Sequence, residues 1–530
     1  MKKKMSLIVI LVVLLSSALC ALPQGASEGK TVQKLIDDAP NGATINLENS
    51  KLYTGDGNRG ISITKNININ GNDAIIDAEK YSRVFNIGEG VKVTISHLTI
   101  KNGKDLEEGG GILNKGVLSL NNCQLYNNSA TDPDYGYYAY GGGISNYGNL
   151  ILSDSKFIDN RANCDGNAYG GAIYSSKKSN LTIIRSSFDH NINDGAVNAN
   201  YRIGGALYID NKANLFVESS NFSNNHADTH AGAIFQGDSS NVNIKSSSFT
   251  NNTAGGSGFG YSGVITNENG NLNINNSNFT GNGLSDDSYS GGGITNAGGN
   301  AKLTVNNSFF SENHAPHSGG AIDIDGIAVV ANSKFVNNRV TSEYSSNPSN
   351  LSDSNSGAIC NNGKLEVVNS LFINNSAGEG GAIKTQPFRA NSEELKIKDS
   401  QFIDNVATDY GGAICVASPV FNIQTVYPKN VNITNSKFEG NKANVGGGIN
   451  VMNADNVSIN NCNMSMNQAH NGGAINSFYS NLRLINSKLF SNTATVNGGA
   501  IYWDHGVLNV DDATNRSFQG NRPTDIFKVS

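Results

Sequence analysis

The sequence predicts an all-β protein, a right-handed parallel β-helix of about sixteen turns with three short strands in each. Three observations predict this fold. A strand motif, a Phe-x-x-Asn motif and a Gly-Gly-Ala-Ile motif recur in the same order along most of the chain. Repeats of this size stack into solenoids, in which each turn contacts only its neighbours. The 530 residues are therefore expected to form one rod, a monomer, rather than several globular domains.

The strand motif places apolar or small residues at steps of two, three and two, as in Val431, Ile433, Ser436 and Phe438. Period-two spacing is typical of a strand with one buried face. The step of three indicates a corner, where a residue such as Asn435 tolerates left-handed backbone. Each copy is therefore predicted to be two strands that meet at a corner. One copy is interpreted with a slip of one residue: Leu181, Ile183, Ser187 and Phe188.

The Phe-x-x-Asn motif follows the second of these strands. Three of its copies are Phe157 with Asn160, Phe249 with Asn252, and Phe402 with Asn405. Each phenylalanine is predicted to stack inside the rod on the phenylalanine of the next turn. Each asparagine is predicted to lie at a turn, where identical amides on successive turns can form a hydrogen-bonded ladder. A small residue often follows two positions later, as Ala162 does.

The Gly-Gly-Ala-Ile motif supplies the third strand of the turn. Two copies are Gly170, Gly171 and Ile173, and Gly411, Gly412 and Ile414. Glycine permits positive φ and a close approach of neighbouring turns, and the isoleucine returns the chain to the core. The intervals between copies vary while the motifs do not, which is how solenoids accept insertions in their loops.

The N-terminus is predicted to be a signal peptide, residues 1–21. Lys2–Lys4 form a basic region, Leu7–Leu15 an apolar region, and Ser16–Ala21 a small-residue end. The apolar run is too short to span a bilayer comfortably, and no second run of spanning length follows. The mature chain is therefore expected to be extracellular, either secreted or at the cell surface or envelope, without a transmembrane segment.

Three further segments are predicted. Residues 22–108 form an N-terminal cap and the first turns, residues 109–521 the motif repeats, and residues 522–530 a closing segment. Within the cap, residues 31–38 have the pattern of a short amphipathic helix. Such a helix would cover the first turn, whose open end otherwise exposes unpaired backbone.

The paired motifs resemble the repeats of chlamydial polymorphic outer-membrane proteins, and they look equally like adhesin-like surface proteins of methanogenic archaea. The resemblance covers roughly residues 109–521. It implies a pectin-lyase-like β-helix at the cell surface. It implies no catalytic residue.

The same fold hosts pectate lyases and polygalacturonases, so an enzyme is the first alternative. Glycoside hydrolysis needs two carboxylates that face one sugar. Asp323 and Asp325 lie two residues apart and could share a face, but no second charged cluster is evident one turn away. The Asp pair, His-Gly and Arg-x-Lys set of polygalacturonases is not found. We therefore predict no catalytic residues and no enzyme, with a polysaccharide lyase or hydrolase as the second hypothesis.

No cofactor and no metal site are predicted. Two histidine pairs, His226 with His230 and His314 with His317, are interpreted as ordinary turn residues. Cys123 and Cys462 occupy the serine position of the strand motif, where a thiol is a small inward-facing side chain. Cys360 and Cys415 both follow a motif isoleucine, but they lie two turns apart, which is too far for a disulfide.

The net charge and the possible glycosylation sites exclude few classes of binding partner. The net charge is −6 and no basic stripe is present, which argues against nucleic acid as a partner. Asn-x-Ser/Thr triplets would accept glycans in a host that glycosylates exported proteins, although an Asn-rich repeat also produces them by chance. They are Asn127, Asn180, Asn251, Asn275, Asn306, Asn374, Asn432, Asn456 and Asn515.

Insertions gather before the paired glycines, and the first carries Tyr135, Tyr137, Tyr138 and Tyr140. Tyrosines on an exposed loop can stack on sugars or anchor a protein partner. The same loop could instead pack on itself and cover a turn. We expect a non-enzymatic, adhesin-like protein that binds glycans or surface proteins of other cells. A structural component of the cell envelope is the third hypothesis.

Overall fold

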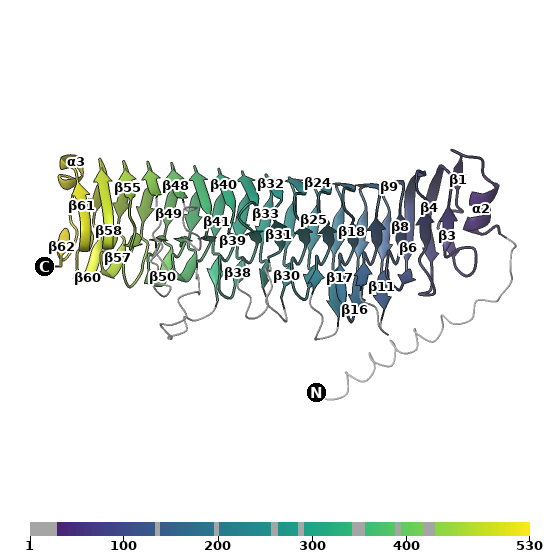
Figure 1. Cartoon of the computed structure of the whole chain (residues 1–530), viewed down its shortest axis with the longest axis horizontal. Coiled ribbons are helices and arrows are strands. Elements are labelled where there is room, and N and C mark those ends of the chain that lie inside the picture. Colours follow the sequence, from purple (N-terminus) through teal and green to yellow (C-terminus); the bar gives the residue numbers. More distant parts are fainter. Residues whose placement is uncertain are drawn as a thin grey trace, which may run out of the picture.

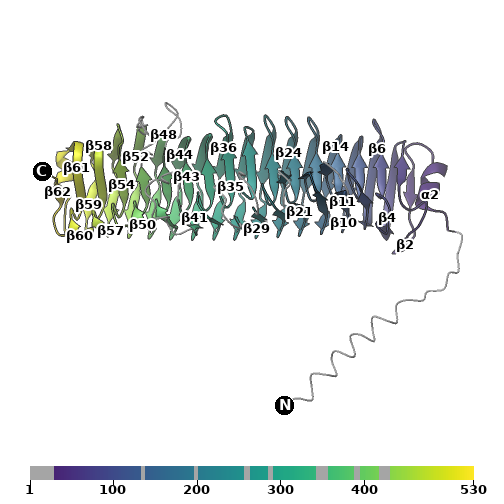
Figure 2. The same ribbon diagram turned by 60° about the horizontal axis from the view of Figure 1, so that its bottom comes forward.

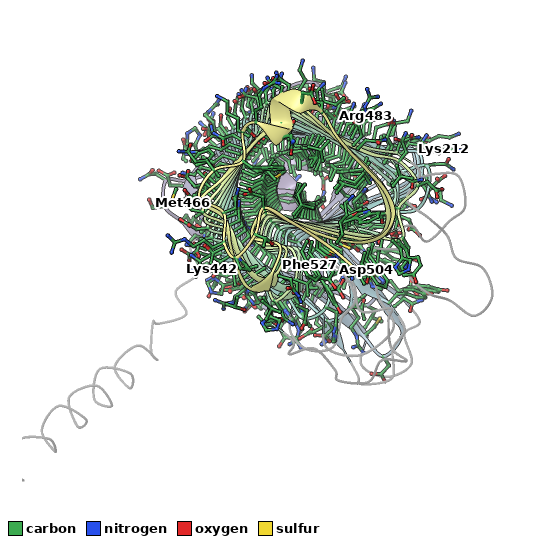
Figure 3. The ribbon with its side chains drawn as sticks, turned by 90° about the vertical axis from the view of Figure 1, so that its left-hand side faces the viewer. Lys212, Lys442, Met466, Arg483, Asp504 and Phe527 are labelled. Carbon is green, nitrogen blue, oxygen red and sulfur yellow. The ribbon has the colours of Figure 1, made fainter. Side chains whose placement is uncertain are left out.

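A computed structural model describes residues 29–132, 138–195, 201–255, 263–284, 291–341, 356–386, 394–416 and 430–529. The chain winds into a parallel β-helix of about 14 turns with almost no helical structure. The turns stack into a long rod whose ends are formed by the first and last described segments (Figure 1). In a view along the rod, the strands of successive turns superpose (Figure 3). The predicted fold class is confirmed, but the number of turns is about 14 and not the expected sixteen.

The isoleucine of each glycine motif opens a strand that pairs with its counterpart on the next turn. β8 (Ile112–Asn114) pairs in parallel with β13 (Ile144–Asn146), and β13 pairs with β18 (Ile173–Ser175). This ladder continues to β61 (Ile501–Val510), and β5 (Phe85–Ile87) extends it toward the N-terminus. Because the isoleucines are in register, the residues that follow them also form a column along the rod.

The strand motif forms two ladders that meet at a corner, as predicted. β28 (Asn241–Lys245) alternates exposed and buried residues, and β29 (Ser248–Thr250) follows it. Between them Ser246 has a φ of 50°. One copy differs from its prediction. The backbone N–H of Ser155 donates to Ser186 Oγ at 3.1 Å, so Ser186, and not Ser187, is the inward small residue and the copy has no slip.

The phenylalanines form a continuous stack inside the rod. The ring centroids of Phe157 and Phe188 lie 4.7 Å apart, and those of Phe249 and Phe279 lie 4.8 Å apart, with nearly parallel planes. The ladder beside it consists of fully buried asparagines, in which each amide donates to the next, as Asn160 Nδ2 does to Asn191 Oδ1 at 3.0 Å. Both predicted stacks are confirmed.

A fourth ladder, which the sequence did not predict, follows the asparagine. It is an 11-stranded parallel sheet that runs from β7 (Lys104–Asp105) to β50 (Val406–Tyr410). Within it, β11 (Ser129–Asp132) pairs with β16 (Arg161–Cys164), which places Ala130 beside Ala162. The small residue after the asparagine is therefore part of a strand. The alternation of buried and exposed residues in this strand is too short for periodicity alone to distinguish the strand from a turn.

The second glycine of the motif lies where two turns touch. A Cβ atom on Gly171 would lie 2.1 Å from the carbonyl oxygen of Gly205 on the next turn. The preceding Gly170 has a φ of +71°, in the region that favours glycine. The motif therefore needs glycine at both positions, for two different reasons.

The N-terminal end is covered by α2 (Val32–Asp38), and the predicted capping helix is confirmed (Figure 2). The Thr31 side chain accepts a hydrogen bond from the Lys34 backbone N–H, and Val32 and Ile36 are buried against the first turn. At the other end lie α3 (Asp512–Asn515) and β62 (Ile526–Lys528). Among the helices of the described ranges, none has the length and apolarity needed to cross a membrane.

Candidate functional site

The predicted loop tyrosines begin a larger aromatic group. Tyr135 and Tyr137 lie outside the described residues. Tyr138 and Tyr140 lie on β12 (Tyr138–Tyr140), which pairs with β17 (Asn167–Tyr169). This pairing sets Tyr140 directly beside Tyr169. The column before the paired glycines therefore carries tyrosines on successive turns.

The column after the motif isoleucine supplies a second row of rings. β18 pairs with β23 (Leu207–Ile209), and this register places Tyr174 beside Tyr208. Tyr147 lies in the turn after β13, and its ring meets that of Tyr174. We call the following residues the tyrosine cluster: Tyr138, Tyr140, Tyr147, Tyr169, Tyr174 and Tyr208. Sequence reasoning missed the last four, although the motif register already placed Tyr174 and Tyr208 in one column.

The rings of the tyrosine cluster pack on one another. Those of Tyr140 and Tyr169 are stacked, with centroids 5.3 Å apart, and those of Tyr174 and Tyr208 are stacked at 5.6 Å. The two stacks meet at an angle, because Tyr140 and Tyr174 are inclined by 55° at 4.7 Å. Most ring faces are therefore covered by other rings. Tyr138 and Tyr147 at the edge of the cluster are the most exposed, at 47% and 38%, and Tyr138 stacks on Tyr140 with one of its two faces.

A shallow hollow of about 170 Å³ lies over the cluster. Its walls are Tyr140, Tyr169, Tyr174, Lys177, Tyr208, Asp210 and Asn211. The Tyr174 hydroxyl donates to Asp210 Oδ2 at 3.0 Å. The hollow thus gathers phenol hydroxyls, a carboxylate, an amide and an ammonium group. These groups donate and accept hydrogen bonds, so the hollow suits a polar ligand rather than an apolar one.

Burial keeps the phenol groups protonated. It raises the pKa of Tyr140 to about 12, with a smaller contribution from Tyr138 and from the Glu108 carboxylate. It also raises the pKa values of Tyr147, Tyr169, Tyr174 and Tyr208, and the Asp210 carboxylate adds to the effect in all four. The cluster therefore presents neutral hydroxyl groups, which donate hydrogen bonds, over the whole physiological pH range.

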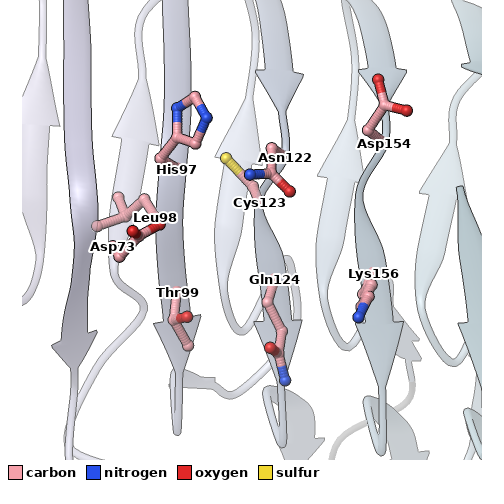
Figure 4. A pocket seen from close by; sticks show the side chains of 9 residues that line it. All are labelled: Asp73, His97, Leu98, Thr99, Asn122, Cys123, Gln124, Asp154 and Lys156. Carbon is pink, nitrogen blue, oxygen red and sulfur yellow. The ribbon is translucent and has the colours of Figure 1, made fainter. Parts of the chain in front are cut away.

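A second hollow, of about 180 Å³, runs along a corner of the early turns (Figure 4). Asp73, His97, Asn122 and Asp154 are the left-handed corner residues of successive turns, with φ between 51° and 60°. All four side chains are exposed. Asp154 is held by Arg185, whose Nε and Nη2 donate to its two oxygens at 2.8 and 2.7 Å. The hydrogen bonds from Arg185 hold the pKa of Asp154 below its ordinary value.

The other candidates from the sequence do not assemble. Asp323 is buried on β39 (Ile322–Ile324) and accepts a hydrogen bond from Ser318. His226 is bound to Asp228 and Thr253. Within the described ranges, no three His, Cys, Asp or Glu side chains are grouped to hold a metal ion.

Comparisons with known proteins match the repeat. Residues 369–386 and 399–417 match the sequence model of the Chlamydia polymorphic membrane protein repeat. Each segment contains a Phe-x-x-Asn motif followed by a Gly-Gly-Ala-Ile motif, as the resemblance implied. No curated protein matches the chain in sequence.

Two solved structures that are similar to the chain are alginate lyases. A PL6 alginate lyase in complex with a trisaccharide shares 12% identity, with a TM-score of 0.32, over 77% of this chain and 81% of its own. A second alginate lyase complex shares 11% identity, with a TM-score of 0.28, over 78% of this chain and 82% of its own. Similarity at this level carries no argument about activity.

Proposed function

We propose that this chain is a non-enzymatic, adhesin-like protein of the cell surface or the extracellular space, which holds glycans or surface proteins at the tyrosine cluster. One observation carries the proposal: tyrosines from neighbouring turns converge on a polar hollow. Among the described turns, this is the only place where the column before the paired glycines and the column after the motif isoleucine both carry tyrosines on successive turns. The matched repeat, whose name refers to a membrane protein of Chlamydia, supports a surface location.

A glycan suits the chemistry of the hollow. Its hydroxyl groups can pair with the phenols, with Asp210 and with Asn211, while one sugar face can cover the exposed ring of Tyr138. Because the rings are already stacked on one another, little side-chain freedom remains to be lost when a ligand binds. The rod itself supplies a rigid support, since every strand is paired to the next turn.

A polysaccharide lyase or hydrolase is the second candidate, and the corner hollow of Figure 4 is its best location, since it brings Asp73 and His97 onto adjoining turns. The solvated state of these groups and the pairing of Asp154 with Arg185 favour the first proposal.

The test is retention of polysaccharides on immobilised protein, residues 22–530, with acidic and neutral polymers and with measurement of chain cleavage. The informative variant carries Tyr140→Phe, Tyr169→Phe and Tyr208→Phe, which removes hydroxyls but keeps the stacks. Tyr479→Phe is the matched control, because Tyr479 is exposed and stacks on His505 far from the cluster.

We expect retention without cleavage, with a loss of about tenfold in affinity in the triple variant, which corresponds to about 1.4 kcal/mol. The control should bind normally. Cleavage of any polymer would overturn the non-enzymatic proposal. Absence of both retention and cleavage would leave the structural envelope role.

A further inference from the structure

The column after the motif isoleucine changes character in the second half of the rod. In register, on β39, β43 (Ile359–Asn361), β47 (Ile383–Thr385), β51 (Ile414–Val416) and β54 (Ile449–Met452), it carries chemically reactive or polar residues. These are Asp323, Cys360, Lys384, Cys415 and Asn450. All of them are buried. Earlier turns carry other residues there, and none of them is an acid, a thiol or an amine: Asn86, Leu113, Ser145, Tyr174, Tyr208, Phe235, Thr266 and Thr295.

Lys384 and Cys415 meet at one carboxylate oxygen. Lys384 Nζ lies 2.8 Å from Glu379 Oε2, and the thiol of Cys415 donates to the same oxygen at 3.8 Å. From the other side, Asn450 Nδ2 donates to Cys415 Sγ at 3.5 Å. Lys384 is 3% exposed and Cys415 is 0% exposed. An amine, a thiol and a base are therefore held together away from water.

Charge at this position is costly to bury. Burial lowers the pKa of Lys384, but the Glu379 carboxylate outweighs it and the net shift is upward. Burial raises the pKa of Cys415, and the Glu379 carboxylate adds to this shift. At rest the site is thus an ammonium, a carboxylate and a neutral thiol. A buried ion pair of this kind adds little stability over apolar side chains of the same size.

Oxidation cannot join the two cysteines of this column to each other. Cys360 and Cys415 lie two turns apart with Lys384 between them. Their separation is about 10 Å, at about 4.8 Å per turn, which a disulfide cannot span. On the turn next to Cys415, the residue paired with it is Lys384, and the side chains of both reach Glu379 Oε2.

We propose that dioxygen joins Cys415 Sγ to Lys384 Nζ through a single oxygen atom, giving a covalent N–O–S bridge between neighbouring turns. The S–H bond and one N–H bond of the neutral amine break, and an S–O and an O–N bond form. One atom of dioxygen enters the bridge and the other leaves as water with the two released hydrogens. Sulfur and nitrogen together lose four electrons, which dioxygen gains. Glu379, which contacts both groups, takes the ammonium proton as the O–N bond forms, because a nitrogen bonded to oxygen is less basic than the resting amine.

Cys360 is the internal comparison. Its Sγ contacts Asn362 Oδ1 at 3.8 Å, and it also hydrogen-bonds Asp323. The register places Cys360 beside Lys384 as well, but its thiol reaches Asp323 and not the Glu379 carboxylate that holds Lys384. The bridge is assigned to Cys415, and Cys360 is expected to stay a thiol.

The test is peptide mass spectrometry of the full chain, purified with and without air. The expected product links the peptides of Lys384 and Cys415 with the mass of one added oxygen less two hydrogens. A thiol reductant should remove it. Lys384→Met and Cys415→Ser should abolish it, whereas Cys360→Ser should not. Cys462→Ser is a control, because that buried thiol donates only to backbone carbonyls.

Circular dichroism of each variant checks that the β-helix has formed, and Cys415→Ser leaves the Lys384–Glu379 pair intact should Lys384→Met fail to fold. An aerobic protein that carries only unmodified thiols overturns the proposal. So does one that gains a whole oxygen at Cys415, which is a sulfenic acid. Persistence of the linked peptide in Cys415→Ser also overturns it.

Discussion

Two stretches of the rod share one core and differ in the column of residues just outside it. Around Phe157 and Phe188 the column after the motif isoleucine carries Tyr174 and Tyr208, and around Phe249 and Phe279 it carries Thr266 and Thr295. The buried rings stack almost identically in both, at 4.7 and 4.8 Å. The inward positions therefore determine the fold. The position after the motif isoleucine, which faces outward beneath the loops, can vary without changing it.

The strongest test of a shared core is to remove a ring from each stretch. Phe249→Ala should lower the free energy of unfolding by about 3–5 kcal/mol, because it leaves a cavity between two stacked rings. Phe157→Ala should cost the same to within about 1 kcal/mol. Urea unfolding followed by circular dichroism measures both. A much smaller loss for Phe157 would mean that the tyrosine-bearing turns are packed differently inside.

The asparagine ladder gives a smaller effect of the same kind. Asn252→Ala should cost about 1–3 kcal/mol, because the amide of Asn225 and the carbonyl of Phe222 lose a partner in the interior. Asn160→Ala should match it. The control is Asn273→Ala, since the Asn273 amide donates to Asn243 on the exposed surface, and its expected cost is below about 0.5 kcal/mol. Equal losses of unfolding free energy in all three variants would show that burial of the asparagine ladder does not increase its contribution to stability.

The free energy of unfolding should depend on pH through His230, which lies at the border of the tyrosine-bearing turns. His230 is buried, its ring lies 6.3 Å from that of Tyr201, and burial lowers its pKa to about 4. Between that value and its ordinary 6.5, the folded protein binds fewer protons than the unfolded chain. Stability present above pH 6.5 should therefore fall as the pH decreases, by at most about 1.4 kcal/mol per unit.

The measurement for His230 is the difference in unfolding free energy between the wild type and His230→Asn, at pH 7.5 and at pH 5. Comparison with the variant removes the contribution of the carboxylates that also titrate. A difference that does not change with pH would show that His230 is solvated.

The smallest expected effect on stability comes from Tyr138→Ala. Tyr138 lies at the exposed edge of the cluster, so the free energy of unfolding should change by less than about 0.5 kcal/mol. Glycan retention should nevertheless fall, because this ring has the free face. Loss of stability without loss of retention would assign Tyr138 a packing role only.

The sequence predicted the parts of the rod in which a residue contacts the same type of residue on the next turn. Asn160 and Phe157 find the same residue type one turn away, so a repeated motif is enough to place them. The same holds for Cys123, whose backbone N–H donates to Ser155 Oγ at 3.1 Å at the serine position. It did not predict the fourth ladder, because a single small residue such as Ala130 carries little periodicity.

The candidate site was only partly predictable. Tyr140 was found because its loop is rich in tyrosine, but Tyr169 and Tyr208 stand alone in their own turns. The motif register places each of them in its column, but it does not reveal that the rings of the two columns meet. Lys384 was missed for a related reason, since an outward position gave no indication that it would be covered.

The asparagine ladder also has a direction. Each Nδ2 donates toward the C-terminal end of the rod, from Asn128 through every turn to Asn521. Aligned amide dipoles add, as peptide dipoles do along an α-helix, so the C-terminal end of the ladder carries partial positive charge. There the last amide donates to Asp525 Oδ1 at 2.9 Å. The rod is thus electrically polar along its length, with a carboxylate in place at its positive pole.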